Sequence, residues 1–387
     1  MTQPDKKLVL QSGEQFYGYG FGANRPTVCD IVFNTSVVGY QEILSDPGYA
    51  DQMVVMTYPV IGNYGITDED FESKQLALGA LVVREYCTMP SNFRFTKTLA
   101  EIMEENSIPG ICGIDTRALT LTLRDKGAMR AAIVDADVTV EQALELIENT
   151  PEQSNVVAKV SCRKRWYSRT PNHKYDVVVV DCGVKRTIIE ELNRRGCNVI
   201  IVPYNTPVEE IRAFNPHGIL ISNGPGSPYC VPEVVELIKE LKGTLPMMGI
   251  SLGHLLIALA YGAKCEHQQN GNRSVSRPVR NMITNRIETT GMSLEYTVSR
   301  ESLEGTGLEV SHSGVLDNMV AGVECRKDKL FSVQYHPEGA PGANDSTYLF
   351  DKFIKLMEGS SNAKKNRYQE SDGYRLWPDC YWSGSRV

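Results

Sequence analysis

The sequence has no apolar run long enough to span a membrane, and its first seven residues are largely polar. A membrane-spanning helix needs about 20 predominantly apolar residues, and a secretory signal peptide needs an apolar segment near its start. We therefore expect neither a membrane span nor a signal peptide. An excess of positive charge is also missing, since the formal net charge is −7. That balance argues against a surface for nucleic acid or for an anionic membrane.

Residue patterns typical of metal sites are missing as well. The ten cysteines show no C-x-x-C spacing, and the six histidines form no H-x-H or H-E-x-x-H pattern. The sequence thus predicts no metal site and no disulfide framework, and we expect reduced thiols in a cytoplasmic protein. Nothing along the chain resembles a P-loop, so we expect the chain itself to bind neither ATP nor any other cofactor.

The sequence does contain a sharp turn between a strand and a helix. Residues 249–253 read Gly-Ile-Ser-Leu-Gly, between an apolar stretch at 245–250 and an apolar helical pattern. This arrangement predicts a nucleophile elbow, in which the glycines permit a strained turn and Ser251 projects from its tip. The helix N-terminus offers free N–H groups to a developing oxyanion. Further along, His336 and Glu338 supply the two orienting members of a candidate triad.

The chain is long enough for two domains, and its pattern changes after about residue 150. Residues 1–150 combine short β-like runs with helical patterns at 98–106, 116–126 and 139–150, which predicts mixed β and α structure. Residues 176–358 alternate strands and helices, which predicts a mostly parallel sheet with ligands at the carboxyl ends of its strands. The predicted fold class is therefore α/β.

Two segments fall outside these domains. Residues 151–175 are predicted to be a linker, because the stretch 162–174 within them is basic and polar with a proline. The two aromatic residues of that stretch would also suit contact with nucleic acid, but the acidic balance of the whole chain favours a solvated arm between domains. Residues 359–387 form a polar tail with several aromatic residues. Disorder and docking on a surface both remain open for this tail.

Several sequence blocks resemble a known family. Three of them resemble the signatures of class I glutamine amidotransferases: Asn-Gly-Pro-Gly at 223–226, Gly-Ile-Ser-Leu-Gly-His at 249–254 and Gln-Tyr-His-Pro-Glu at 334–338. Blocks in the N-terminal half resemble the small chain of carbamoyl-phosphate synthetase, and they lie at residues 33–36, 39–44, 58–65 and 113–117. The resemblance covers roughly residues 7–358 in the family's order, so the chain is identified as a member of this family.

The resemblance implies a glutaminase that serves a larger chain. In the family a cysteine thiolate attacks the side-chain amide of glutamine, and the released ammonia passes through a tunnel to an ATP-using large chain. The family's elbow reads G-I-C-L-G-H-Q, whereas this chain reads Gly-Ile-Ser-Leu-Gly-His-Leu. A serine hydroxyl ionises far less readily than a thiol, and removal of a triad nucleophile costs on the order of 10⁶ in kcat in a well-studied protease. We therefore predict that Ser251, His336 and Glu338 form a degenerate, inactive triad.

The resemblance also locates the family's glutamine pocket on this chain. Its positions are Gly48, Gly224, Gly226, Leu252, Leu255, Thr289, Gly291 and Met292. Gly48 replaces a serine of the family, Leu255 replaces a glutamine, and residues 288–292 depart from the family's Q-N-H-G-F/Y block. Each lost polar partner costs roughly 1–3 kcal/mol, so three losses reduce affinity by about 10²–10⁶. Because nucleophile and pocket differ together, we predict a naturally inactive glutaminase.

Three functions fit these residues. The first is a pseudo-amidotransferase, in pyrimidine or arginine biosynthesis, that docks on or regulates a carbamoyl-phosphate synthetase large chain or a paralogue of it. The second is a hydrolase that uses Ser251, His336 and Glu338 on an amide or ester other than glutamine. The third is a free-standing anion sensor, and the residues that could bind the anion are Arg273, Arg277, Arg280 and Arg286. We favour the first, because the blocks that the family uses for contact between chains match better than the pocket does.

Overall fold

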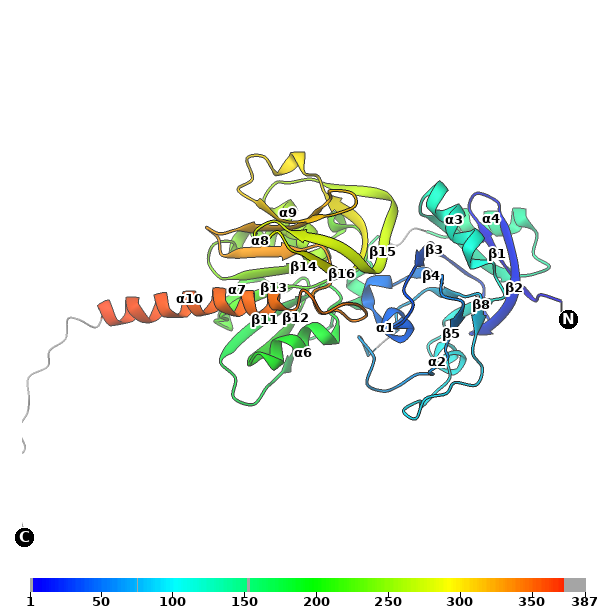
Figure 1. The fold of residues 1–387 in the computed structure, drawn as a ribbon, viewed down its shortest axis with the longest axis horizontal. Helices are drawn as coiled ribbons and strands as arrows, with labels where there is room; N and C mark the ends of the chain where they lie inside the picture. Colours follow the sequence, from blue (N-terminus) through cyan, green and yellow to red (C-terminus); the bar gives the residue numbers. More distant parts are fainter. Residues whose placement is uncertain (1–2, 75, 152–153, 372–387) are drawn as a thin grey trace, which may run out of the picture.

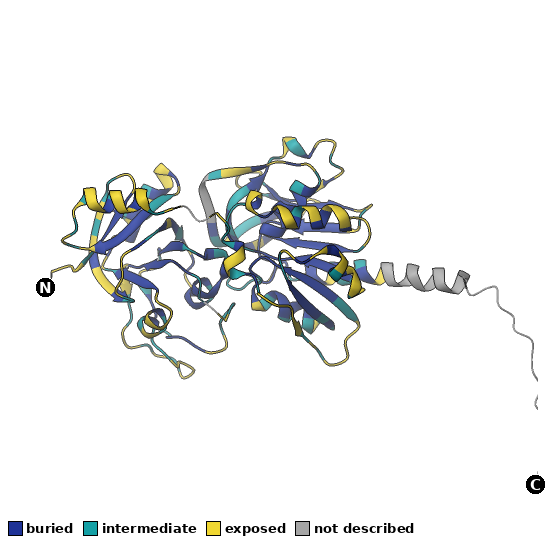
Figure 2. Cartoon of the chain, turned by 180° about the vertical axis from the view of Figure 1, so that it is seen from behind, coloured by how far each residue is buried: buried dark blue, intermediate teal, exposed yellow. Residues whose placement is uncertain are grey.

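The computed structural model describes residues 3–74, 76–151 and 154–371. Figure 1 shows two domains side by side, an N-terminal one in blue and cyan and a C-terminal one in green to red. Each domain has hydrophobic cores of its own, and Figure 2 shows them as buried strands beneath helices with exposed outer faces. Within the described ranges, no helix has both the length and the apolar character that crossing a membrane requires.

The N-terminal domain is built on a closed β-barrel. Its strands, in the order in which they pair, are β1 (Lys6–Leu10), β2 (Gln15–Gly22), β8 (Pro109–Cys112), β6 (Ala80–Val82), β4 (Gln52–Met56), β3 (Thr27–Asn34) and β9 (Met129–Asp135). Strand β4 is buried along its whole length, because Met53 and Val55 belong to the barrel core while Val54 and Met56 pack with the helices outside. Its first residue, Gln52, reaches the C-terminal domain through a hydrogen bond to Glu295.

The three helices predicted in this domain are present. They are α2 (Leu99–Glu105), α3 (Thr116–Lys126) and α4 (Val140–Asn149). Thr98 and Thr139 begin α2 and α4 with capping boxes, in which side chains satisfy the free N–H groups of the first turn. The remaining elements are α1 (Tyr40–Ser45), the 3₁₀ turn η1 (Pro47–Tyr49) and a small sheet of β5 (Val60–Ile61) and β7 (Glu85–Tyr86).

The C-terminal domain contains a ten-stranded sheet. Five central strands run parallel, in the order β12 (Cys197–Pro203), β11 (Tyr175–Asp181), β13 (Gly218–Ile221), β14 (Met247–Ile250) and β19 (Leu330–Val333). Antiparallel strands complete the edges: β10 (Trp166–Ser168) on one side, and β18 (Val320–Cys325), β16 (Ile287–Val298), β15 (Cys265–Asn281) and β17 (Glu309–Gly314) on the other. The predicted α/β class with a parallel centre is confirmed.

Helices cover both faces of this sheet. Val177 and Val179 of β11 pack on one face with α6 (Arg186–Arg194) and α10 (Tyr348–Ser371). Val178 and Val180 pack on the other face with α8 (Pro232–Leu241) and α9 (Leu252–Ala260). The shorter helices are α5 (Val157–Val160), α7 (Val208–Ala213), η2 (Pro228–Cys230) and η3 (Glu301–Leu303). Because the parallel strands end at one edge, the turns after β11, β13, β14 and β19 meet there.

The segments expected to lie outside the two domains contain regular structure. Residues 151–175, predicted as a linker, include α5 and β10, and β10 pairs with β12. This part of the segment therefore extends the sheet, although its side chains at 163–167 are exposed. The predicted closing helix continues as α10 to Ser371, so the first part of the expected tail is helical. The rest of the tail, with its aromatic residues, lies outside the described residues.

Candidate functional site

The predicted elbow forms at Ser251, between β14 and α9. Its backbone has φ 53° and ψ −108°, a strained conformation for a residue with a side chain. The turn is fixed by neighbouring strands: the Ser251 N–H donates to the Val333 carbonyl at 2.9 Å, and the Gly253 N–H donates to the Ser222 carbonyl at 3.1 Å. A Cβ at Gly253 would collide with the carbonyl of Ile221. Glycine is therefore required at position 253 for β13 and α9 to pack this closely.

The two other members of the predicted triad are paired with each other. His336 Nδ1 lies 2.8 Å from Glu338 Oε1, just beyond the end of β19. Lys185, from the turn after β11, places its Nζ 2.9 Å from the same carboxylate oxygen and also donates to the Ala340 carbonyl. The side chains of Lys185 and Glu338 are almost completely buried. Sequence reasoning missed Lys185, although its place just after a parallel strand, where such folds bind ligands, was a usable signal.

Charge pairing controls the ionisation of this group. Burial raises the pKa of Glu338, but its interactions with Lys185 and His336 outweigh burial and hold the pKa at about 2. Burial lowers the pKa of Lys185, yet Glu338, Glu72 and Asp46 outweigh burial and raise it above its ordinary value. Glu338 is therefore an anion and Lys185 a cation at neutral pH. The carboxylate is consequently shared between the His336 ring and a buried cation.

Ser251 and His336 line different cavities. Ser251 lines a cavity of about 30 Å³ together with Gly48, Gly224, Gly226, Leu252 and Leu255. His336 lines a second cavity, of about 20 Å³, together with Lys185, Gly291 and Met292. In the part of the chain that the structure describes, no hydrogen bond joins Ser251 Oγ to the His336 ring. The serine is therefore not paired with a general base.

The predicted pocket residues thus line two cavities, and one of them, Thr289, lines neither. Thr289 is exposed, and its N–H donates to the Asp345 carboxylate at 2.9 Å. Leu255 and Met292 are each 4% exposed and belong to the hydrophobic cores on opposite faces of the sheet. Each of these two residues thus packs in a core and also lines one of the two cavities.

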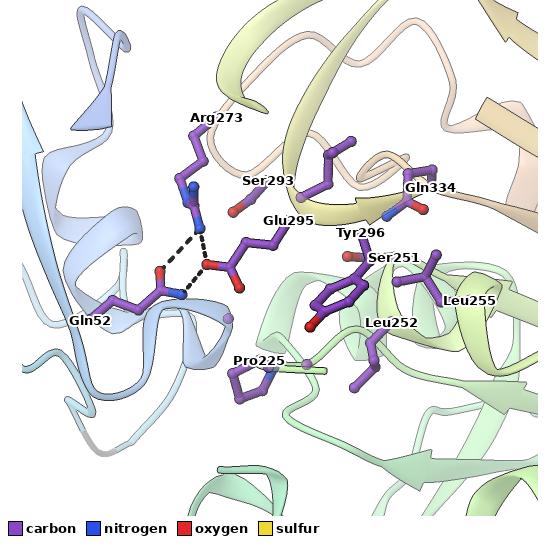
Figure 3. A pocket seen from close by; sticks show the side chains of 14 residues that line it. Gln52, Pro225, Ser251, Leu252, Leu255, Arg273, Ser293, Glu295, Tyr296 and Gln334 are labelled. Atoms are coloured by element: carbon purple, nitrogen blue, oxygen red, sulfur yellow. Dashed lines mark hydrogen bonds and ion pairs between the residues drawn. The ribbon is translucent and has the colours of Figure 1, made fainter. Parts of the chain in front are cut away.

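Three residues that sequence reasoning did not link form a polar cluster at the wall of the Ser251 cavity. Arg273 forms an ion pair with Glu295, and Gln52 Nε2 donates to Glu295 Oε1 at 2.7 Å. Arg273 Nη2 also donates to Gln52 Oε1 at 3.5 Å. Figure 3 shows the three side chains converging, with Gln52 on the N-terminal domain and the other two on the C-terminal domain. No local signal reveals this cluster, because Gln52 and Arg273 are 221 positions apart.

The four arginines predicted as an anion site do not converge. Arg273 is buried and neutralised by Glu295. Arg277 pairs with Asp317, and Arg280 Nη1 lies 3.5 Å from Asn285 Oδ1 on the surface. Arg286 is exposed. This arrangement provides no concentrated positive charge for an anion.

Comparison with known proteins yields two family matches. Residues 8–133 match the carbamoyl-phosphate synthase small chain CPSase domain, and residues 178–356 match glutamine amidotransferase class I. The chain is 45% identical over 357 residues to the carbamoyl phosphate synthase pyrimidine-specific small chain of Halalkalibacterium halodurans, covering 92% of this chain and 98% of that protein. It is 43% identical over 353 residues to the protein of the same description from Bacillus subtilis, covering 91% and 96%. The carbamoyl phosphate synthase small chain of Fusobacterium nucleatum is 43% identical over 356 residues, covering 92% and 99%.

Proposed function

Because the chain belongs to the carbamoyl-phosphate synthase small-chain family, we propose that it is a pseudo-amidotransferase, which docks on an ATP-using large chain without hydrolysing glutamine. The observation that carries this proposal is that no hydrogen bond joins Ser251 Oγ to the His336 ring among the described residues, whereas His336 is bonded to Glu338. A serine becomes a nucleophile only when a base can take its proton during attack. Ser251 has no such partner, so the first chemical step of the family is not supported.

The size of the cavity supports the same conclusion. A cavity needs about 10–15 Å³ to hold one water molecule, whereas binding sites for small molecules are typically about 300–1,000 Å³. The Ser251 cavity, at about 30 Å³, has room for a few waters but not for an amino acid. The charged side chains that line this cavity, Arg273 and Glu295, are already paired with each other. Glutamine would have to displace that pair, and breaking a buried pair is unfavourable.

The N-terminal domain, by contrast, keeps well-formed structure in the blocks that the resemblance assigns to contact between chains. In block 39–44, Gln41 is fully buried, and its side chain bonds both the carbonyl and the N–H of Thr67. Next to this block Val37 and Val38 are 62% and 60% exposed. Adjacent exposed apolar residues beside an ordered segment are suited to a protein partner. Two relatives are described as pyrimidine-specific, so we propose pyrimidine biosynthesis as the pathway.

Reconstitution with a large chain tests this proposal. The chain would be co-expressed with the large chain from the same genome, and the mixture analysed by size exclusion at micromolar concentration. A stable complex should bury at least about 1,200 Å² and therefore co-elute. The rate of ammonia-dependent carbamoyl-phosphate synthesis should also change when the two chains combine. Separate elution together with an unchanged rate would exclude a pseudo-subunit.

The strained turn at Ser251 and the intact His336–Glu338 pair favour one second candidate, a hydrolase for another amide or ester. Such an enzyme requires Ser251 to bond to the His336 ring, and no such hydrogen bond is present among the described residues. A serine-directed fluorophosphonate is the appropriate probe, with Ser251→Ala as the control. Labelling of the native chain that disappears in the control would favour the hydrolase. We expect the native chain and Ser251→Ala to be labelled to the same extent.

A further inference from the structure

The cluster of Gln52, Glu295 and Arg273 joins the two domains beside Ser251. Gln52 begins β4 of the N-terminal barrel, whereas Arg273 and Glu295 lie on β15 and β16 of the C-terminal sheet. Gln52 is 8% exposed and Arg273 is 6% exposed. All three residues line the Ser251 cavity, and Figure 3 shows them between the N-terminal domain and the serine. Together with Gly48, they form the part of the cavity wall that crosses the domain boundary.

Each of the three side chains forms a hydrogen bond to the other two. One carboxylate oxygen of Glu295 accepts from both Arg273 and Gln52, and the amide oxygen of Gln52 accepts from Arg273. The charges that line the cavity thus neutralise each other and do not need a ligand. Arg273 Nε has no hydrogen-bond partner among the described residues, so the set is not fully satisfied. An unpaired buried donor lowers the free energy needed to break the cluster.

We propose that Gln52, Glu295 and Arg273 form an interdomain clamp that holds the Ser251 cavity shut. An amino acid could enter only if the clamp opened, because the cavity has a volume of about 30 Å³. The clamp therefore excludes amino-acid ligands independently of the residue at position 251. It also links the two domains in the absence of any bound ligand. All three residues of the clamp belong to this chain, so the proposal can be tested on the isolated protein.

Access to position 251 can be measured by alkylation. In a Ser251→Cys background, iodoacetamide would be applied and the modified peptides quantified by mass spectrometry. Cys230 is exposed and serves as the internal reference in every sample. With the clamp intact, the thiol at position 251 should react at least about tenfold more slowly than Cys230. Gln52→Ala should raise the relative rate about tenfold, because it removes a hydrogen bond to a charged group that joins the domains.

Two further variants make the comparison specific. Arg273→Ala with Glu295→Ala removes both charges together and should open the cavity at least as far as Gln52→Ala. Lys159→Ala is the matched control, because Lys159 pairs with Asp51 across the same boundary at 2.7 Å but does not line the cavity. This control should leave the relative rate unchanged. If the double variant does not fold, as judged by circular dichroism, the relative alkylation rate in Gln52→Ala alone tests the proposal.

A second reagent separates access from thiol reactivity. A change in the pKa of the thiol would affect iodoacetamide and the larger N-ethylmaleimide alike, whereas opening of the cavity should favour the larger reagent more strongly. The proposal is overturned if the thiol at position 251 reacts as fast as Cys230 with the clamp intact. It is equally overturned if folded Gln52→Ala leaves both rates unchanged, or if Lys159→Ala raises them as much.

Discussion

Lys185 Nζ lies 2.9 Å from Glu338 Oε1, so the carboxylate that orients His336 is also paired with a buried cation from a residue 153 positions earlier. This pair connects the turn after β11 to the turn after β19, at the edge where the parallel strands end. A buried ion pair whose partner is removed leaves an uncompensated charge, so we expect this pair to contribute to stability whether or not the site is catalytic.

Removal of the cation should destabilise the fold. In Lys185→Met, Glu338 would remain buried without its partner, and breaking a buried pair in this way costs about 3–5 kcal/mol. Urea unfolding would measure the free energy of unfolding. Lys159→Met, which breaks an exposed pair with Asp51, should cost less than about 1 kcal/mol. A loss below about 1 kcal/mol in Lys185→Met would contradict the structural role of the pair.

The stability of the protein should fall in mild acid because of two buried histidines. Burial is the main cause that lowers the pKa of His254 to about 3 and of His312 to about 4, from an ordinary value of 6.5. Below pH 6.5 the unfolded chain therefore binds protons that the folded chain does not. Stability is fully present above pH 6.5 and decreases as the pH falls toward 4, on the order of 1–3 kcal/mol for each histidine.

Thermal unfolding between pH 7 and 4 checks this prediction. The matched variant is His312→Gln, because glutamine can still bond to Ser311 or Tyr348, which lie 3.0 and 3.3 Å from the ring nitrogens. The variant should show a smaller decrease in Tm over this range than the native protein. Identical pH profiles for the two proteins would mean that His312 is not buried in its neutral form.

A single substitution at the elbow should not create a glutaminase. Ser251→Cys supplies the family's nucleophile, but Leu255 and Gly48 still provide no polar contacts and the cavity stays small. We expect ammonia release from glutamine to equal that of Ser251→Ala. A glutamine-dependent rate at least about tenfold above that control would show that the pocket is intact. This outcome would contradict the inference that the small Ser251 cavity excludes glutamine.

The exposed valines of the N-terminal domain should contribute to docking. Val37→Asp would place a charge in an apolar contact, which we expect to weaken binding of the large chain by about tenfold or more. Leu121→Asp is the control, because Leu121 is 42% exposed on α3, outside the matched blocks. Titration with labelled large chain would compare the two Kd values. Equal Kd values would place the contact surface elsewhere on the chain.

Much of the fold was predictable from local patterns. The alternation of strands and helices over residues 176–358 predicted a parallel sheet, and the helical patterns at 98–106 and 139–150 predicted α2 and α4. The elbow was predictable because glycine is required where α9 approaches β13. The strand β10 was not, because it is a short, mostly exposed edge strand that follows three exposed basic residues, and such a segment has the composition of a solvated arm.

The site was predictable only in part. The resemblance identified Ser251, His336 and Glu338, but it could not show that the serine and the histidine line separate cavities. The partners Lys185, Gln52 and Glu295 depend on contacts between distant segments, and each of these residue types is ordinarily found on the surface. Thr289 was assigned to the pocket by its place in a sequence block, yet the local course of β16 leaves it exposed.

The most direct test of the account is the ratio of glutamine-dependent to ammonia-dependent carbamoyl-phosphate synthesis in the complex with the large chain. The ratio would be measured for the native chain and for Ser251→Ala at equal concentrations. We predict a ratio near zero and the same in both complexes, while ammonia supports synthesis in each. A substantial ratio with the native chain that is lost in Ser251→Ala would contradict the account, because Ser251 would then be an active nucleophile.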